Sequence, residues 1–408
     1  MVLELGVMPH LNITTPLGRK MLVLILGVMG MFPALASDVY LPAFPEVARE
    51  LHVTINQVQF TLAASMVGMG VGMLGWGMWS DRVGRRLPAL IGTLMYVTAS
   101  ILCVFSPNLG WLIVWRLVQG AGGAAAVVAS RALVRDFFSG TEMARMLAAV
   151  STVFFITPVV APSVGALILG VANWQALFVM MAAFGVFGSI GILALPESLK
   201  VENRVSNNFG QAMVAFGRIL RDGHFRQYFW QNAASVCITI SYISTTSDVY
   251  LVHFGLPRPS FALIFGITAF GQMVGAQVNR RLLKRIAVKR LLTGFVIAQF
   301  SFATALFLVG HFTDAAWAVI LFQVLTIFCG GSVVGNGTTL ALRDYQVNAA
   351  SGVALLALAQ SLAGAFAAAA TSFIPFEPVQ RMTTAMWGAA VASFLLMITR
   401  QIRKRQIP

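Results

Sequence analysis

The chain has 408 residues, of which 58% are hydrophobic and only 10% are charged. This composition excludes an ordinary set of soluble domains, in which about a quarter of the residues are charged. The formal net charge of +14 would suit nucleic-acid binding, so the position of the basic residues along the chain has to decide.

Long apolar segments recur along the whole sequence. A helix that crosses a bilayer needs about 20 such residues, and lipid offers backbone groups no partners, so these segments are expected to be helices. The first six candidate spans are residues 20–41, 57–79, 88–106, 110–131, 143–169 and 174–196. The other six are residues 225–252, 260–279, 290–310, 314–337, 347–374 and 380–399. The sequence therefore predicts an all-α membrane protein with twelve transmembrane helices.

The basic residues indicate which side of the membrane each loop faces. With the N-terminus inside, nearly all of the 28 lysines and arginines fall at cytoplasmic loops and helix ends. Only Arg49, Arg258 and Arg381 fall outside, and Arg116 lies within a span. This asymmetry is the positive-inside rule, so the basicity encodes topology rather than a nucleic-acid partner. Both termini are expected in the cytoplasm.

A five-residue repeat marks the organisation of the chain. The sequence SDVYL ends the first candidate span at residues 37–41 and ends the seventh at residues 247–251. This matching position favours an internal duplication, with two six-helix bundles related by an axis along the membrane normal. We expect an N-terminal bundle over residues 1–198, a cytoplasmic linker with an amphipathic helix over 199–224, and a C-terminal bundle over 225–408.

The loop between the second and third spans reads GMWSDRVGRR, residues 77–86. Gly77 would let helices approach closely, Gly84 would permit a tight turn, and Asp81 could cap or pair locally. The loop resembles the cytoplasmic signature of the major facilitator superfamily and departs from it at Trp79. In that family the loop stabilises one conformation of the alternating-access cycle. The resemblance implies this gating role for Gly77, Asp81, Arg82, Gly84, Arg85 and Arg86.

Further stretches resemble other motifs of the same family. RLVQGAGGAAA, residues 116–126, is similar to its second signature, and its small residues predict tight helix packing. TPVVAPSVGA, residues 157–166, partly resembles the signature of drug/proton antiporters, so Pro158, Pro162 and Gly165 are assigned to the conformational gate. SDVYLPAFP, NWQALF and LPESL resemble the bicyclomycin- and chloramphenicol-resistance branch. Residue 248 is often proline in that branch and is aspartate in this chain.

Apart from residues at the cytoplasmic and outer ends of the spans, three residues within the candidate spans are charged: Asp38, Arg116 and Asp248. A charge at the bilayer centre costs about 2.5–3.5 kcal/mol on insertion scales, so such residues usually pair or line a cavity. Burial favours the protonated form of a carboxyl group and a nearby arginine favours the ionised form. We assign all three residues to proton coupling, in one shared polar pocket. The alternative is structural, with the aspartates near the interface and Arg116 anchoring the fourth span to the first.

Other polar or adaptable side chains within the spans are candidate substrate contacts. They are Tyr40, Met66, Gln119, Tyr242, Thr245, Gln272, Gln323, Asn336 and Gln360. A structural role is the alternative for each, since hydroxyls often bond their own helix and Met or aromatic residues often fill cores.

No catalytic constellation, nucleotide-binding loop or metal-binding pattern stands out, so an enzyme is not expected. The resemblance implies a monomeric, cofactor-free secondary transporter of the bacterial cytoplasmic membrane that exports drug-like or amphiphilic molecules in exchange for protons, by alternating access. Its expected partners are a small-molecule substrate, protons and the bilayer. A dedicated exporter of one endogenous metabolite, such as a siderophore, and an uptake symporter remain alternatives.

Overall fold

Twelve long helices account for most of the chain in this computed structural model, which describes residues 11, 15–204, 209–313, 315–343, 345 and 349–406. The first six are α1 (Pro16–Asp38), α3 (Ile55–Val83), α4 (Arg86–Val104), α5 (Leu109–Phe137), α6 (Gly140–Val171) and α7 (Gln175–Ala194). The others are α9 (Gly223–Ser247), α10 (Arg258–Leu282), α11 (Val288–Phe312), α12 (Ala316–Ala341), α13 (Ala349–Thr371) and α14 (Pro378–Gln406). Each overlaps one predicted span.

Within the described residues, eleven helical segments are long and apolar enough to cross a membrane. The exception among the twelve is α9, whose second half carries the hydroxyl side chains of residues 244–247. These side chains are buried, so α9 hides its polar groups inside the protein rather than exposing them to lipid. The predicted twelve-helix architecture is confirmed once this polar helix is counted among the spans.

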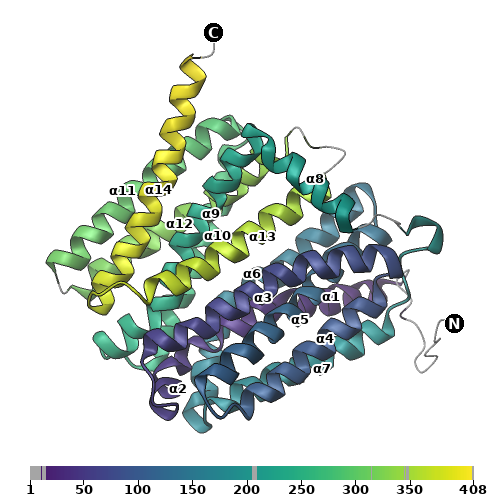
Figure 1. Ribbon diagram of the computed structural model, residues 1–408, viewed down its shortest axis with the longest axis horizontal. Helices are drawn as coiled ribbons and strands as arrows, with labels where there is room; N and C mark the ends of the chain where they lie inside the picture. The colour runs from purple at the N-terminus through teal and green to yellow at the C-terminus, as the bar shows by residue number, and fades with distance from the viewer. Residues whose placement is uncertain are drawn as a thin grey trace.

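The long helices pack in two groups (Figure 1). Helices α1 and α3–α7 form the first group, and α9–α14 form the second. The groups meet mainly where α3 lies along α13 and where α6 lies along α10. The predicted division into two six-helix bundles is thereby confirmed, whereas the domain boundaries at residues 198 and 225 stay a prediction.

Short helices connect the long ones. The 3₁₀ turn η1 (Leu41–Ala43) and α2 (Phe44–Glu50) follow α1, and the π-helical turn η3 (Asp248–His253) extends α9. A second 3₁₀ turn, η2 (Val201–Asn203), and α8 (Phe209–Arg221) lie between the groups in the sequence. Helix α8 buries Phe216 and Ile219 and exposes Arg218, as expected for an amphipathic linker helix.

Small residues set the close approach of α3 and α5, as the run at residues 120–126 predicts. A Cβ atom added at Gly120 would lie 2.8 Å from the carbonyl carbon of Ser65, so only glycine fits there. Gly77 is different, because a Cβ atom at that position would meet nothing within 4 Å. The expectation that Gly77 permits close helix contact is wrong; the tight positions of α3 lie earlier, at Gly68 and Gly72.

We expect Gly120→Ala to destabilise the protein by about 1–3 kcal/mol, because overpacking forces α3 and α5 apart. Gly77→Ala is the matched control: it adds the same methyl group to a helix but into open space. Thermal unfolding of the purified variants in detergent measures the difference. Equal midpoints for the two variants would contradict the packing argument.

Candidate functional site

The two ends of the helix bundle differ in the bonds they make. We call the end that contains Tyr40, α2 and η3 the Tyr40 end. The opposite end contains the loop between α3 and α4, and we call it the Arg85 end. In Figure 1, α2 marks the Tyr40 end and α8 lies toward the Arg85 end.

A cavity of about 210 Å³, which we call the central cavity, lies inside the first group of helices. Side chains of α1, α3, α4, α5 and α6 line it, and none of its lining residues comes from the second group. Four predicted site residues line it together: Asp38, Met66, Gln119 and Pro158. The sequence prediction therefore brings residues from four helices to one cavity, though without Arg116 or Asp248.

Asp38 ends α1 at the wall of this cavity and is only 4% exposed. Its carboxylate accepts a hydrogen bond of 2.6 Å from the Ser37 hydroxyl, which also donates to the Pro33 carbonyl oxygen. Among the described residues, no cation forms an ion pair with Asp38. A buried carboxyl group without a cation beside it is chemically suited to take up and release a proton.

Arg116 is fully buried in α5 and reaches the cavity only through Gln119. Its Nη1 donates to Gln119 Oε1 at 2.6 Å, and Gln119 Nε2 donates to the Ser100 hydroxyl at 2.7 Å. The Arg116 Nε and Nη2 atoms have no acceptor among the described residues. A buried guanidinium with unused N–H donors can bind a carboxylate or a substrate oxygen if its surroundings rearrange.

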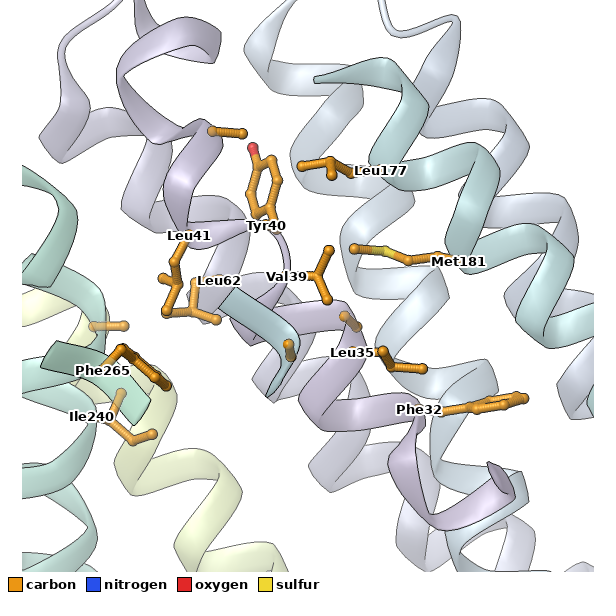
Figure 2. Close-up of a cluster of buried hydrophobic side chains, with 14 of the residues drawn as sticks. Phe32, Leu35, Val39, Tyr40, Leu41, Leu62, Leu177, Met181, Ile240 and Phe265 are labelled. Carbon is orange, nitrogen blue, oxygen red and sulfur yellow. The ribbon is translucent and has the colours of Figure 1, made fainter. Parts of the chain in front are cut away.

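Tyr40 holds Arg116 from the other side and does not line the cavity. The Arg116 guanidinium carbon lies 4.9 Å from the Tyr40 ring centroid and 5.7 Å from that of Phe178. Such cation–π contacts stabilise a buried arginine and tie α5 to the segment after α1. Figure 2 shows Tyr40 among buried apolar side chains, with Leu177 beside it. The structure thus places Tyr40 in the core rather than at a substrate surface.

The remaining candidates lie in the second group, and none lines the cavity. Thr245 donates to the Ser241 carbonyl oxygen of its own helix at 2.6 Å. Gln323 accepts from the Tyr250 hydroxyl at 2.5 Å and donates to Thr268 at 2.8 Å.

Asn336 exchanges two hydrogen bonds with Asn279, at 3.0 and 2.9 Å. Tyr242 is buried and stacks on Phe265 at 5.7 Å, and Gln272 and Gln360 are half-buried. In this conformation the side chains of Thr245, Gln323 and Asn336 form their hydrogen bonds within the second group.

The two SDVYL copies meet at the interface between the groups. The Ser247 hydroxyl donates to the Leu41 carbonyl oxygen at 2.6 Å, so the second copy bonds directly to the first. Apolar contact supports this meeting point, since Leu41 and Leu62 face Ile240 and Phe265 in Figure 2.

The aspartates of the two copies have different partners. Asp248 pairs with Arg381 Nη1 at 3.0 Å, and both side chains are at most 12% exposed. Arg381 also donates to the Asn56 side chain at the start of α3. The expectation that Asp38, Arg116 and Asp248 share one pocket is not met, because Asp248 belongs to an ion pair at the Tyr40 end that the sequence did not reveal.

A second ion pair closes the same end. Arg258 Nη2 lies 3.0 Å from Glu46 Oε2, and Arg258 Nη1 donates to the Leu169 carbonyl oxygen at 2.6 Å. Ser372 adds a hydrogen bond of 2.9 Å to the Asn56 carbonyl oxygen. The hydrogen bonds from Ser247 to Leu41, from Arg381 to Asn56 and from Ser372 to Asn56 thus join the two groups at the Tyr40 end and hold that end shut.

Asp81, Arg85 and Arg86 of the signature loop form bonds within the first group. Gly84 ends α3 with φ of 113°, a conformation that favours glycine, which confirms the predicted tight turn. Arg85 pairs with Asp81, as expected, and with Asp136 at 3.0 Å. Burial disfavours the charge of Arg85, yet the bonds and charges of Asp81 and Asp136 raise its pKa above the ordinary value.

Glu197 completes this network at the N-terminus of α4. It accepts from the backbone N–H groups of Arg85 at 2.8 Å and Arg86 at 3.2 Å. A carboxylate is favoured there by the helix dipole. Arg86 itself donates to the Leu193 carbonyl oxygen at 2.6 Å. Sequence reasoning missed Glu197, although it lies in the quoted LPESL motif.

The three residues of α6 that the sequence assigns to the conformational gate lie in different surroundings. Gly165 lies against the Val39 backbone, where a Cβ atom would come 3.4 Å from the Pro42 ring and closer still to the Val39 carbonyl group. Pro158 lines the cavity, whereas Pro162 lies buried one turn further along. Among the described residues, no cluster of histidine, cysteine and acidic side chains could hold a metal ion.

Comparison with known sequences gives a consistent result. The family model described as the Major Facilitator Superfamily matches residues 26–368. The uncharacterized MFS-type transporter YdgK of Bacillus subtilis is 32% identical over 355 residues, covering 86% of this chain and 88% of that protein. The bicyclomycin resistance protein homolog of Haemophilus influenzae is 25% identical over 387 residues, covering 94% and 97%. The multidrug resistance protein MdtL of a Shewanella species is 26% identical over 393 residues, covering 94% and 97%.

Solved structures share the fold at low identity. The xylose transporter XylE from E. coli, in a partially occluded inward-open conformation, has a TM-score of 0.71 and 13% identity, covering 95% of this chain and 98% of XylE. A bacterial homolog of the human lysosomal transporter Spinster has a TM-score of 0.72 and 13% identity, covering 95% and 97%. Both likenesses concern the fold alone.

We expect Arg381→Gln to open the Tyr40 end more often. Arg381 bonds across the groups to Asn56, and its loss also leaves Asp248, its partner within the second group, as an uncompensated buried charge at a cost of about 3–5 kcal/mol. The measurement uses Ser247→Cys in a background whose three native cysteines are replaced by alanine. A membrane-impermeant maleimide should label that cysteine faster when Arg381 is changed.

Two controls separate this effect from a general loss of charge. Arg49→Gln removes an exposed arginine from the same end and should leave labelling unchanged. Adding Asp248→Asn to Arg381→Gln removes the stranded carboxylate and should restore part of the protection. Labelling that responds equally to Arg49→Gln and Arg381→Gln would show that Arg381 has no special role in closing the Tyr40 end.

Proposed function

The chain belongs to the Major Facilitator Superfamily, and on that premise we propose that it exports drug-like or amphiphilic small molecules in exchange for protons. The observation that carries the proposal is Asp38, a buried carboxylate at the wall of the cavity, bonded to Ser37 and paired with no cation among the described residues. The printed names of the relatives, which refer to bicyclomycin and multidrug resistance, support the substrate class.

The orientation follows from the charge distribution. The positive-inside rule puts the Arg85 end and both termini in the cytoplasm of a bacterium, and the Tyr40 end outside. The bonds at the Tyr40 end then close the outer entrance, so the cavity of this conformation communicates with the cytoplasm. Substrate enters there, and breaking the bonds between the groups, among them the Glu46–Arg258 ion pair and the Arg381–Asn56 hydrogen bond, opens the outer side.

The coupling step uses competition for one carboxylate. A protonated Asp38 holds no cationic substrate, whereas an ionised Asp38 does, so substrate and proton displace each other as the cavity changes sides. Arg116 supports the exchange, because its unused Nε and Nη2 donors can stabilise an ionised Asp38 when Gln119 moves aside. No resident cofactor is required, since the proton gradient supplies the energy, and a single chain holds every group invoked.

Asp38→Asn is expected to abolish transport driven by a pH gradient, because an amide cannot exchange a proton. Inside-out vesicles containing the protein are acidified inside, and accumulation of cationic, neutral and anionic compounds is measured at several external pH values. Asp248→Asn is the matched control, since it changes the other aspartate of the repeat and should leave pH dependence intact.

The outcomes distinguish the alternatives. Strict preference for cations would place the carboxylate in substrate binding as well as in coupling. Accumulation only when the gradient is reversed would indicate uptake by symport, and flux confined to one compound would indicate a dedicated exporter. Asp38→Asn transport with the rate and pH dependence of the wild type would rule out Asp38 as the coupling group.

A further inference from the structure

A second hollow lies on the outside of the second group of helices. It is a groove of about 570 Å³ formed by α9, α13 and α14, and we call it the lateral groove. Its lining contains only apolar residues, among them Trp230, Ala234, Cys237, Leu362, Phe366 and Leu396. Its volume falls in the usual range of ligand pockets, which is about 300–1,000 Å³.

The lateral groove opens to the surroundings of the protein rather than to the central cavity. Trp230, Leu362 and Phe366 are 53%, 42% and 71% exposed at its mouth. These side chains belong to helices that cross the membrane, so the medium that covers them is the hydrocarbon of the bilayer.

A continuous wall separates the lateral groove from the site of transport. Cys237 donates to the Ala363 carbonyl oxygen at 3.3 Å, which closes α9 onto α13. Behind this contact, a Cβ atom at Gly364 would lie 3.1 Å from Met66, which lines the central cavity. The lateral groove is therefore a site of its own.

A basic residue stands at one end of the lateral groove. Arg226 precedes Trp230 by four residues on α9, so the two side chains project from the same face of the helix. Arg226 is exposed, and no described acidic side chain forms an ion pair with it. It lies toward the Arg85 end, where Arg218 and Arg221 of α8 add positive charge. Basic residues at the end of an apolar groove between membrane helices are suited to anionic lipid headgroups.

We propose that the lateral groove binds one acyl chain of an anionic phospholipid, whose phosphate is held by Arg226. Trp230 lies between the two, with its apolar ring along the chain and its indole N–H near the headgroup, as tryptophan does at membrane interfaces. The bound lipid rests on α13, the helix that meets α3 of the other group, and so contacts an element of the moving interface.

Photo-crosslinking tests the site directly. The purified protein is reconstituted in phosphatidylcholine vesicles with a trace of phosphatidylglycerol that carries a diazirine on one acyl chain, and labelled peptides are identified by mass spectrometry. We expect labels concentrated on α9, α13 and α14, and unlabelled phosphatidylglycerol should compete for them better than phosphatidylcholine. Arg226→Gln should lower labelling of these peptides about fivefold, the effect of one basic residue at a membrane surface.

Matched variants complete the test. Arg290→Gln removes an exposed arginine from α11, outside the groove, and should not change labelling. Ala234→Phe fills the groove and should suppress the labelling, whereas Ala183→Phe adds the same ring to an exposed position of α7 and should leave it unchanged. Labels spread evenly around the protein, or equal responses to Arg226→Gln and Arg290→Gln, would overturn the proposal whether or not Asp38 couples transport to protons.

Discussion

Inside a bilayer, a charged or polar side chain has to find its partner within the protein, because hydrocarbon offers none. Most of the architecture follows from this constraint. Arg116 is held by Gln119 and by aromatic rings, Asp248 is held by Arg381, and the hydroxyl-rich half of α9 is buried in the second group. Asp38 has the Ser37 hydroxyl as its partner and, among the described residues, no cation, and a buried carboxyl group of this kind is suited to proton chemistry.

The polar bonds are distributed unequally between the two ends. At the Tyr40 end they run between the groups, as from Ser247 to Leu41 and from Arg258 to Glu46. The bonds of Arg85 and Arg86 stay within the first group, where Asp136 and Glu197 bind the loop to its own helices. A rocking motion about the central cavity would therefore break bonds at the Tyr40 end while leaving the Arg85 network intact.

The sequence predicted the helices well, because the bilayer imposes a length and an apolar composition that can be read directly from the chain. It also identified Asp38 and Gln119, which are unusual residues at membrane depth. It could not show that Arg381 would reach Asp248, since the two are far apart in sequence and Arg381 was placed in an outer loop. The expectation of close helix contact at Gly77 was wrong for a related reason. A glycine in a sequence motif does not show whether another helix packs against it.

The central cavity is lined by one half of the molecule alone, whereas the Glu46–Arg258 ion pair and the hydrogen bonds from Ser247 to Leu41 and from Arg381 to Asn56 join both halves at the Tyr40 end. On the proposed function, chemical selectivity and mechanical closure are encoded at different positions. Substitutions around Met66 would then change which substrates are carried without weakening the bonds at the Tyr40 end. Such a protein can evolve to carry new substrates by changes in the cavity alone. Chimeras that exchange only the first half would inherit its selectivity.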